Sequence, residues 1–437
     1  MKKILITSLT GIMSMSLVAQ TKWSLDSCIN YAIEHNLTVK ARELDRMSGE
    51  YDITEAQDRF LPSLSASAGQ SFNFGRGLTS ENTYANRNTK NFQWGVNMSL
   101  PLFQGLSATR QLKYARINYR SLLLQIESAK DDITLNVISQ YLQVLAYSEM
   151  LKNAQEQVEL SDYELKRQEA LAEAGKIAEI DVLQARSQLA NDRQNYTDTE
   201  NNLAIARLDL AQLLNLPSPE NFDIEPIQTL DPVIMSPDDV YMRAMSSNNS
   251  IKSAKNDIEA AQAGVSLAKS GYLPHLSFTA GIGSSYYNIS GIENPSFSRQ
   301  MRDNLNKSIG FSLTVPIFDA FSTRNSVRKA RIRELSAALQ LENRTTTLYQ
   351  EIQQAYYRAT GARQKYLTGI ETESIAREAL DAIKGKYEMG RSTPTEFEQA
   401  KVQYQQASIN RIQSHYEYIL RTRILDFYGS NRRLTEQ

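Results

Sequence analysis

Cysteine and histidine are scarce in this chain, and each scarcity excludes a class of site. Cys28 is the only cysteine among 437 residues, so neither an internal disulfide nor a multi-thiolate metal site can form. His35, His275 and His415 lie in separate segments without metal-ligand spacing around them. No Ser/His/Asp or Cys/His signature is evident either. We therefore expect neither an enzyme nor a bound cofactor.

Long apolar runs are also missing, except at the start. Met1-Lys2-Lys3 is followed by an apolar stretch from Ile4 to Val18 and by the small residues before Thr21, the pattern of a secretory signal peptide over residues 1–20. A retained N-terminal anchor is the alternative. No later run reaches about eighteen apolar residues, so any bilayer crossing must be made by strands.

The mature chain has little net charge. Removing Lys2 and Lys3 takes the 48 basic side chains to 46, against 49 acidic ones, and the net charge moves from −1 to −3. Such a surface offers no basic field for nucleic acid, which is not expected as a partner. Cys28 follows Asp26, which fits a lipoprotein processing site poorly, so we interpret it as a small buried helix residue, with a lipid anchor as the alternative.

The sequence contains an internal duplication. Leu61-Pro62-Ser63-Leu64-Ser65 returns 212 residues later as Leu273-Pro274-His275-Leu276-Ser277, and Gly175-Lys176 returns 215 residues later as Gly390-Arg391. This duplication predicts two structural repeats, residues 21–215 and 236–429, and a short tail over 430–437. Five prolines between 216 and 237 exclude a regular helix there, so 216–235 is interpreted as a Pro-rich connector.

Each repeat carries two segments in which apolar and small polar residues alternate, at about 62–75, 91–103, 275–287 and 307–318. A period of two predicts strands. The polar loops between them, about 76–90 and 288–306, are longer than hairpin turns and favour an outer-membrane barrel over the face of a soluble sandwich. Aromatic residues gather toward the loop ends, where a membrane-interface girdle is expected: Phe72, Phe74, Phe92, Trp94, Tyr286 and Tyr287.

The rest of the chain has helical periodicity. Apolar residues from Leu112 to Ile133 are spaced alternately by three and four, as in a coiled-coil seam. We expect long helices over 104–173 and 319–388, each about 105 Å long, and return helices over 179–214 and 394–428. Shorter helices over 24–60 and 236–272, about 55 Å each, would stack end to end with the return helices, leaving the connector and both termini as a belt at mid-height.

Four strands cannot close a barrel of the required size, so the barrel must be shared between chains. The small side chains on the polar face suit an open lumen, which favours three chains and twelve strands over two chains and eight. The predicted fold is mainly α with a β-barrel part: a trimeric 12-stranded barrel, four strands from each protomer, continued by a long α-helical barrel.

These features together resemble the TolC-like outer-membrane efflux proteins over the whole mature chain. The resemblance rests on the duplicated unit, on the strand-to-helix passages Leu100-Pro101-Leu102-Phe103 and Val315-Pro316-Ile317-Phe318, and on the helix tips around Gly175 and Gly390. It implies an outer-membrane exit duct of a tripartite efflux or type I secretion system. It also implies a homotrimer in outer-membrane lipid that docks a periplasmic adaptor (a membrane fusion protein) and an inner-membrane transporter of the RND, ABC or MFS type.

The resemblance further implies a closed periplasmic entrance at the helix tips. Glu396 occupies the place of an acidic residue that constricts this entrance, Gln399 that of a second acid often found there, and Asp181 the equivalent place in the first repeat. Whether the entrance carries one acidic ring or two is therefore left open. The turns that would carry the tips and dock the adaptor are Gly175, Lys176, Gly390, Arg391 and Ser392.

Glu396 also has a plain structural interpretation. Thr393-Pro394-Thr395-Glu396 reads as a capping box, with Thr393 as N-cap and Pro394 in the first helical position. The main alternative to a channel is a periplasmic coiled-coil scaffold or adaptor without a pore. A weaker alternative is an outer-membrane hydrolase with a helical extension.

Overall fold

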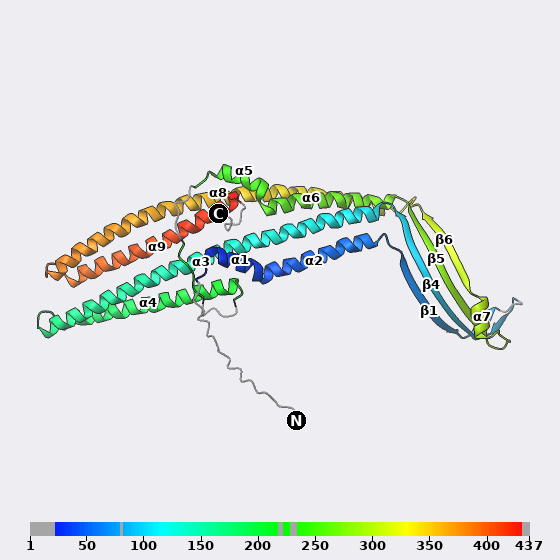
Figure 1. Cartoon of the computed structure of the whole chain (residues 1–437), viewed down its shortest axis with the longest axis horizontal. Helices are drawn as coiled ribbons and strands as arrows, with labels where there is room; N and C mark the ends of the chain where they lie inside the picture. The colour runs from blue at the N-terminus through cyan, green and yellow to red at the C-terminus, as the bar shows by residue number, and fades with distance from the viewer. Residues whose placement is uncertain (1–21, 79–81, 217–221, 228–233, 431–437) are drawn as a thin grey trace, which may run out of the picture. The chain divides into compact units, whose positions relative to one another are not determined.

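The computed structural model describes residues 22–78, 82–216, 222–227 and 234–430 (Figure 1). The predicted signal peptide and residues 431–437 of the predicted tail lie outside the described residues. The elements run in the order α1 (Leu25–His35), α2 (Leu37–Asp58), β1 (Ser63–Asn73), β2 (Arg76–Leu78), β3 (Tyr84–Asn86), β4 (Thr89–Gln104), α3 (Ser107–Glu173), α4 (Glu179–Leu213), α5 (Pro237–Ser247), α6 (Asn249–Ala268), the 3₁₀ helix η2 (Lys269–Tyr272), β5 (His275–Ile289), α7 (Phe297–Asp303), β6 (Asn306–Thr314), α8 (Ser322–Glu388) and α9 (Pro394–Ser430).

The same order of main elements occurs twice. Two helices, two strands, a long helix and a return helix appear first as α1-α2-β1-β4-α3-α4 and again as α5-α6-β5-β6-α8-α9. The two long helices each contain 67 residues and end at Glu173 and Glu388, the positions expected from the sequence.

The first helix of each repeat is not continuous, which corrects the prediction of single helices over 24–60 and 236–272. The chain turns extended at Asn36, with φ −64° and ψ 130°, and at Asn248, with φ −61° and ψ 125°. The Asn36 side chain accepts a hydrogen bond from the Thr38 N–H at 2.9 Å and donates to the Leu213 carbonyl at 3.3 Å. An asparagine that bonds the backbone locally competes with the helix, so the helix ends there.

Two further predictions about the strands need correction. β6 ends at Thr314 rather than near 318, because Pro316 has no N–H for the ladder, whereas β4 passes Pro101 through a bulge between Pro101 and Phe103. The loops predicted over 76–90 and 288–306 contain the β2–β3 pair and the short helix α7.

The described chain forms two compact units, and each takes residues from both repeats. The sheet unit comprises the described parts of 41–128 and 249–347, and the helical unit comprises the described parts of 1–40, 129–248 and 348–437. Both long helices contribute to both units, since α3 passes from one to the other at residue 129 and α8 at residue 348.

In the sheet unit, four antiparallel strands pair in the order β1-β4-β5-β6. The register places alternate residues of all four strands on one side: Ala68 pairs with Trp94, Trp94 with Ser284, and Met98 with Ala280, which pairs with Ile309. The predicted alternation therefore becomes one mainly apolar face and one face of Ser, Gly, Asn and Gln. β1 and β6 are the outer strands, and their outer edges have no strand partner within the described residues.

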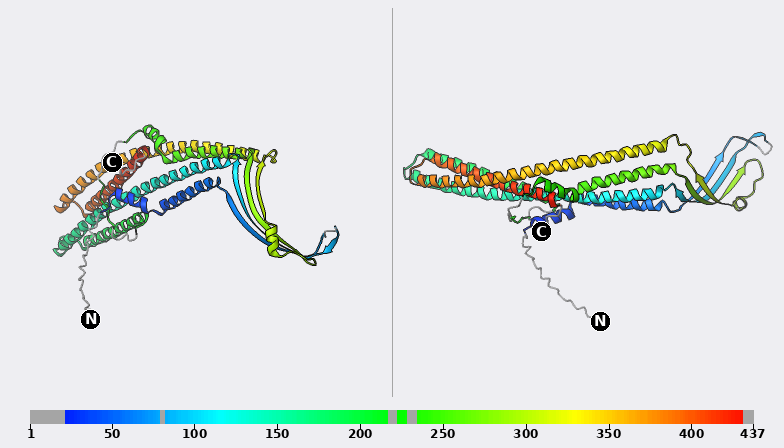
Figure 2. Two further views of the ribbon diagram at one scale, coloured as in Figure 1. Left: turned by 45° about the vertical axis from the view of Figure 1, so that its right-hand side comes forward. Right: turned by 90° about the horizontal axis from the view of Figure 1, so that it is seen from above.

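The helices of the sheet unit lie side by side in the order α2, α3, α6, α8 (Figure 2, right). Tyr119 of α3 donates to Glu50 of α2 at 3.0 Å, and Arg120 of α3 pairs with Glu259 of α6 at 3.2 Å. Arg344 of α8 donates to Ser250, at the start of α6, at 2.6 Å. The outer helices α2 and α8 thus connect directly to the outer strands β1 and β6.

The core of the helical unit lies where the two ends of the first repeat meet α3. Buried Cys28 and Ile29 of α1 belong to one apolar cluster with Ile138 of α3 and Leu210 of α4. The connector residues that the structure describes join this cluster, since Ile224 pairs with Trp23 and Phe222 is buried. Among the described residues, no helix combines the length and the apolar composition that a bilayer crossing needs.

Candidate functional site

The tips of the helical unit are two turns built in the same way. Gly175 follows α3 with φ +69°, and Gly390 follows α8 with φ +72°. Lys176 N–H donates to the Leu171 carbonyl and Arg391 N–H to the Lys386 carbonyl, at 2.9 and 2.8 Å, which closes a Schellman motif at each helix end. Glycine is favoured there because the left-handed region is strained for residues with a Cβ atom.

Glu396 caps α9. Its backbone N–H donates to Thr393 Oγ1 at 3.2 Å, and its carboxylate accepts from the Thr393 N–H at 2.8 Å and from Ser392 Oγ at 2.7 Å. Both halves of the capping box expected from the sequence are therefore present. The hydrogen bond from Ser392, followed by those from Thr393, holds the pKa of the Glu396 carboxyl below its usual range, so this exposed side chain stays charged.

Asp181 has a related role that the sequence did not suggest. It is the third residue of α4, and its carboxylate accepts from the Ala178 N–H at 3.3 Å. Ala178 has no side-chain oxygen to complete the box. The Asp181 and Glu396 carboxylates share no hydrogen bond in the described structure. The other predicted tip residues differ in exposure: Ser392 is half-buried, and the exposed ones are Gln399, Lys176 and Arg391.

Behind the tips, α8, α9 and α3 are joined through Tyr387. Its ring stacks on buried Phe397 with centroids 5.0 Å apart, and the Arg167 guanidinium lies 4.8 Å over the same ring. Gln168 donates to the Tyr387 hydroxyl at 3.1 Å. The two turns are thus carried on helices that pack directly against one another.

A buried ion pair that the sequence analysis missed lies further along α9. Lys401 is 1% exposed, and its Nζ donates to Asp192 Oδ2 of α4 at 2.9 Å and to Ser161 Oγ of α3. A usable signal was present: polar side chains recur along α3 with the three-and-four spacing of a buried seam, at Gln157, Ser161, Glu164 and Gln168.

The aromatic residues predicted for a membrane girdle do not all lie on one face. Phe92 and Tyr286 are register partners on the apolar face, and the Phe297 ring of α7 packs on both, at 5.7 and 5.1 Å. Tyr287, the next residue along β5, points to the polar face. Phe72 lies on the apolar face and is exposed, and exposed Phe74 follows the end of β1.

Cys28, His35 and His415 have structural surroundings. Burial raises the pKa of the Cys28 thiol to about 12, consistent with a small core residue. His35 stacks on Tyr31 at 4.0 Å and His415 on Tyr366 at 4.7 Å. No cluster of three or more His, Cys, Asp or Glu side chains that could hold a metal ion occurs within the described ranges.

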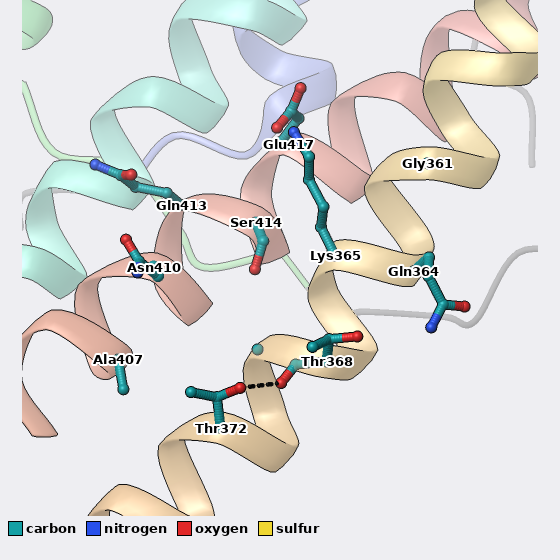
Figure 3. A pocket seen from close by; sticks show the side chains of 11 residues that line it. Gly361, Gln364, Lys365, Thr368, Thr372, Ala407, Asn410, Gln413, Ser414 and Glu417 are labelled. Carbon is teal, nitrogen blue, oxygen red and sulfur yellow. Dashed lines mark hydrogen bonds between the residues drawn. The ribbon is translucent and has the colours of Figure 1, made fainter. Parts of the chain in front are cut away.

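A cavity of about 670 Å³ opens between α8 and α9 (Figure 3). Some of the lining residues are small, among them Gly361 and Gly369 of α8 and Ala407 of α9. Its other lining groups are amides, hydroxyls, Lys365 and Glu417. This polar composition is that of a solvated groove between two helices.

Comparison with known proteins agrees with this architecture. The sequence model of the family described as "Outer membrane efflux protein" matches residues 28–216 and 240–425. The outer membrane protein TolC of Escherichia coli is 24% identical over 400 residues, covering 88% of this chain and 78% of that protein. The outer membrane efflux protein BepC of Brucella suis is 18% identical over 398 residues, covering 91% and 83%.

Solved structures share the fold. The CmeC outer membrane channel of Campylobacter jejuni matches with a TM-score of 0.79 at 16% identity, covering 94% of this chain and 87% of that one. The MtrE outer membrane channel of Neisseria gonorrhoeae, solved in its open state, matches with a TM-score of 0.75 at 17% identity, covering 94% and 91%.

The family match covers both repeats and most of the chain, so neither a pore-less scaffold nor a hydrolase describes this protein. It is an efflux channel rather than an enzyme, and it lies in the outer membrane with a helical portion in the periplasm. This chain belongs to the outer membrane efflux protein family.

Proposed function

We propose that three copies of this chain close one continuous duct, a twelve-stranded barrel in the outer membrane followed by a helical barrel in the periplasm. In this assembly residues 21–215 and 236–429 act as two structural repeats joined by the connector 216–235. The duct conducts substrate passively, and the energy for transport comes from an inner-membrane transporter of the RND, ABC or MFS type through a periplasmic adaptor.

The two unpaired sheet edges carry the proposal. An open edge in lipid leaves backbone N–H and C=O groups without partners, at a cost of several kcal/mol each, so a sheet that enters a bilayer must close. β1 has an outer edge of 11 residues and β6 one of 9, and they lie at opposite sides of the same sheet. Pairing of β6 with β1 of a neighbouring copy removes both edges.

The face that such a barrel turns to lipid is apolar and exposed in the single chain. Leu64 is 73% exposed, Ile309 77% and Phe311 70%, all on the apolar side of the sheet. The opposite side carries the small polar residues that suit a water-filled lumen.

The outer helices of the sheet unit support the same closure. Leu44, Met47 and Tyr51 form an exposed stripe along α2, and Ile332, Leu335 and Leu339 form one along α8. The residues of each stripe are three or four positions apart, so they share a helix face. Because α2 and α8 flank the unit, the α8 stripe of one copy meets the α2 stripe of the next.

We place the periplasmic entrance at the helix tips. Glu396 and Gln399 lie one turn apart on the exposed side of α9, and Asp181 lies in the first turn of α4. The turns Gly175, Lys176, Gly390, Arg391 and Ser392 then form the surface that docks the adaptor. Exposed Ile180, Leu183 and Met389 give that surface apolar contact area.

The mass and conductance of the purified mature protein test the proposal together. In detergent, light scattering coupled to size exclusion should give the mass of three chains. In a planar bilayer, the same preparation should give discrete conductance steps. A monomer that needs no detergent, or a trimer that never conducts, is incompatible with the proposed duct.

A further inference from the structure

Lys401 joins three helices of the helical unit at one buried point. Its Nζ lies 2.9 Å from Asp192 Oδ2 of α4, donates to Ser161 Oγ of α3, and lies 3.9 Å from Glu398 Oε2 on its own helix. The side chains of Lys401 and Asp192 are each 1% exposed. Both charges are therefore out of water.

Asp192 is itself held in place. Gln188 donates to its second oxygen, Oδ1, at 3.1 Å, and Ser161 Oγ donates to Oδ2. The acceptor that faces Lys401 thus has a fixed direction, set by one residue of α3 and one of α4.

The same turns of α9 have two distinct faces. Phe397, Ala400 and Lys401 are buried, whereas Glu396, Gln399 and Val402 are exposed. At about 100° per residue, Gln399 and Lys401 lie about 200° apart around the helix axis. A direction imposed on Lys401 therefore sets the direction in which Gln399 and Glu396 face.

Apolar contacts alone fix this rotation poorly, because the hydrophobic effect is non-directional. Rotating α9 away from Asp192 would break the buried ion pair and leave the buried Asp192 carboxylate without Lys401, which is strongly unfavourable. Single buried polar groups are known to specify register in helix bundles. From this arrangement we infer that the Lys401–Asp192–Ser161 cluster is a rotational lock on α9, and that Lys401 is a positioning residue for the entrance. The link to the entrance rests on the proposed function; the lock itself does not.

The test replaces the pair without emptying the site. Lys401→Met with Asp192→Leu exchanges a buried ion pair for apolar side chains, a change that commonly leaves stability equal or higher. A cysteine is placed at Gln399 or at Ala400, and its labelling rate by a water-soluble maleimide is measured on the detergent-solubilised full chain. Cys28 is not replaced, because it is fully buried and its raised pKa keeps the thiol protonated and unreactive toward maleimide.

In the parent, Gln399→Cys should label much faster than Ala400→Cys. With the pair replaced, the ratio of the two rates should fall by about tenfold, as expected when several rotational states share the population. Arg186→Gln with Glu169→Gln removes an exposed ion pair between the same helices α4 and α3, at 3.1 Å, and should leave the ratio unchanged. An unchanged ratio in the Lys401/Asp192 variant at parental melting temperature overturns the inference.

If that double variant does not fold, Ser161→Ala provides the second test. It keeps the ion pair but removes one acceptor of Lys401, and should lower the ratio by a smaller factor than about tenfold. A parental ratio in this variant also counts against the lock. Cross-linking of Gln399→Cys between protomers with a bifunctional maleimide tests the entrance separately. Its absence in the parent argues against the entrance, whatever the labelling ratios show.

Discussion

Ala320 and Phe321 occupy, 215 residues later, the positions of Gly105 and Leu106. All four have positive φ, between 51° and 63°, so both strand-to-helix passages use two consecutive left-handed residues. This conformation costs a residue with a Cβ atom about 1 kcal/mol or more, and glycine far less. Ala320 in the second repeat is therefore under backbone strain that Gly105 avoids at the equivalent position of the first repeat.

We expect Ala320→Gly to be neutral or to stabilise the protein by up to about 1 kcal/mol, because strain relief offsets the greater freedom of the unfolded chain. Gly105→Ala should destabilise it by more than that, since a Cβ atom there would lie 2.8 Å from the Ser270 carbonyl oxygen. Thermal denaturation of the two variants measures both effects. Equal losses in both would mean that the second passage is not strained.

Glu398 gives the helical unit a pH dependence of known sign. Burial raises the pKa of its carboxyl, with the Asp192 and Glu164 charges adding to this and Lys401 opposing it. A carboxyl whose pKa is raised on folding destabilises the fold when ionised, so stability should increase as the pH falls through its folded pKa and the carboxyl takes up a proton. Glu398→Gln should raise the melting temperature at neutral pH and remove the contribution of Glu398 to this increase.

The comparison between wild type and variant isolates Glu398 from His415. Burial lowers the pKa of the His415 ring, so acid destabilises the fold at this residue. This effect on stability is opposite in sign to that of Glu398. The difference in melting temperature between Glu398→Gln and wild type should shrink in mild acid. A constant difference would show that Glu398 does not titrate in this range.

At the scale of elements, α8 has two different environments along its length. Ile332, Leu335 and Leu339 are each about two-thirds exposed, while Leu348 and Ile352 further along are fully buried. The exposed stripe makes sense only if a partner covers it, since exposed leucines at helical spacing mark a contact face.

Leu335→Glu should therefore weaken the association of protomers by about 2 kcal/mol per interface, the value of burying one leucine. Gln340→Glu introduces the same charge at an exposed position about 140° around the helix from Leu335 and serves as the matched control. The fraction of trimer in detergent, measured by mass photometry or light scattering, reports the difference. Equal dissociation in both variants would place the stripe outside the interface.

At the scale of the whole molecule, the question is whether the acids at the tips cap helices, constrict a pore, or do both. Replacing Glu396 and Asp181 by Ala should raise single-channel conductance, because the substitutions remove negative charge and bulk from the proposed entrance. Thr393→Ala separates the roles, since it removes the N-cap hydroxyl that Glu396 N–H uses but keeps the carboxylate. Its conductance should stay at the wild-type level. A rise equal to that of Glu396→Ala would reduce Glu396 to a cap.

Most local features followed from periodicity in the sequence. The strands β1, β4 and β5 begin and end within two residues of their expected positions or extend slightly beyond them, and both long helices end where predicted. The misses were local: the Asn36 side chain bonds the backbone where α1 ends, the backbone turns extended at Asn248 where α5 ends, and Pro316 ended β6. Tyr287 was assigned to the girdle by its place along the strand, although neighbouring residues in a strand face opposite sides.

By itself, the sequence determined the duplicated unit, the faces of the strands and the helix-tip turns, because each depends on residues only a few positions apart. The tertiary structure alone decided which polar groups meet in the interior. Ser161 and Lys401 are 240 residues apart in the sequence. Their contact depends on how each helix is rotated about its own axis, and local periodicity determines that rotation only roughly. It also decided that β1 and β6 are the outer strands, because strand order comes from how the two repeats pair.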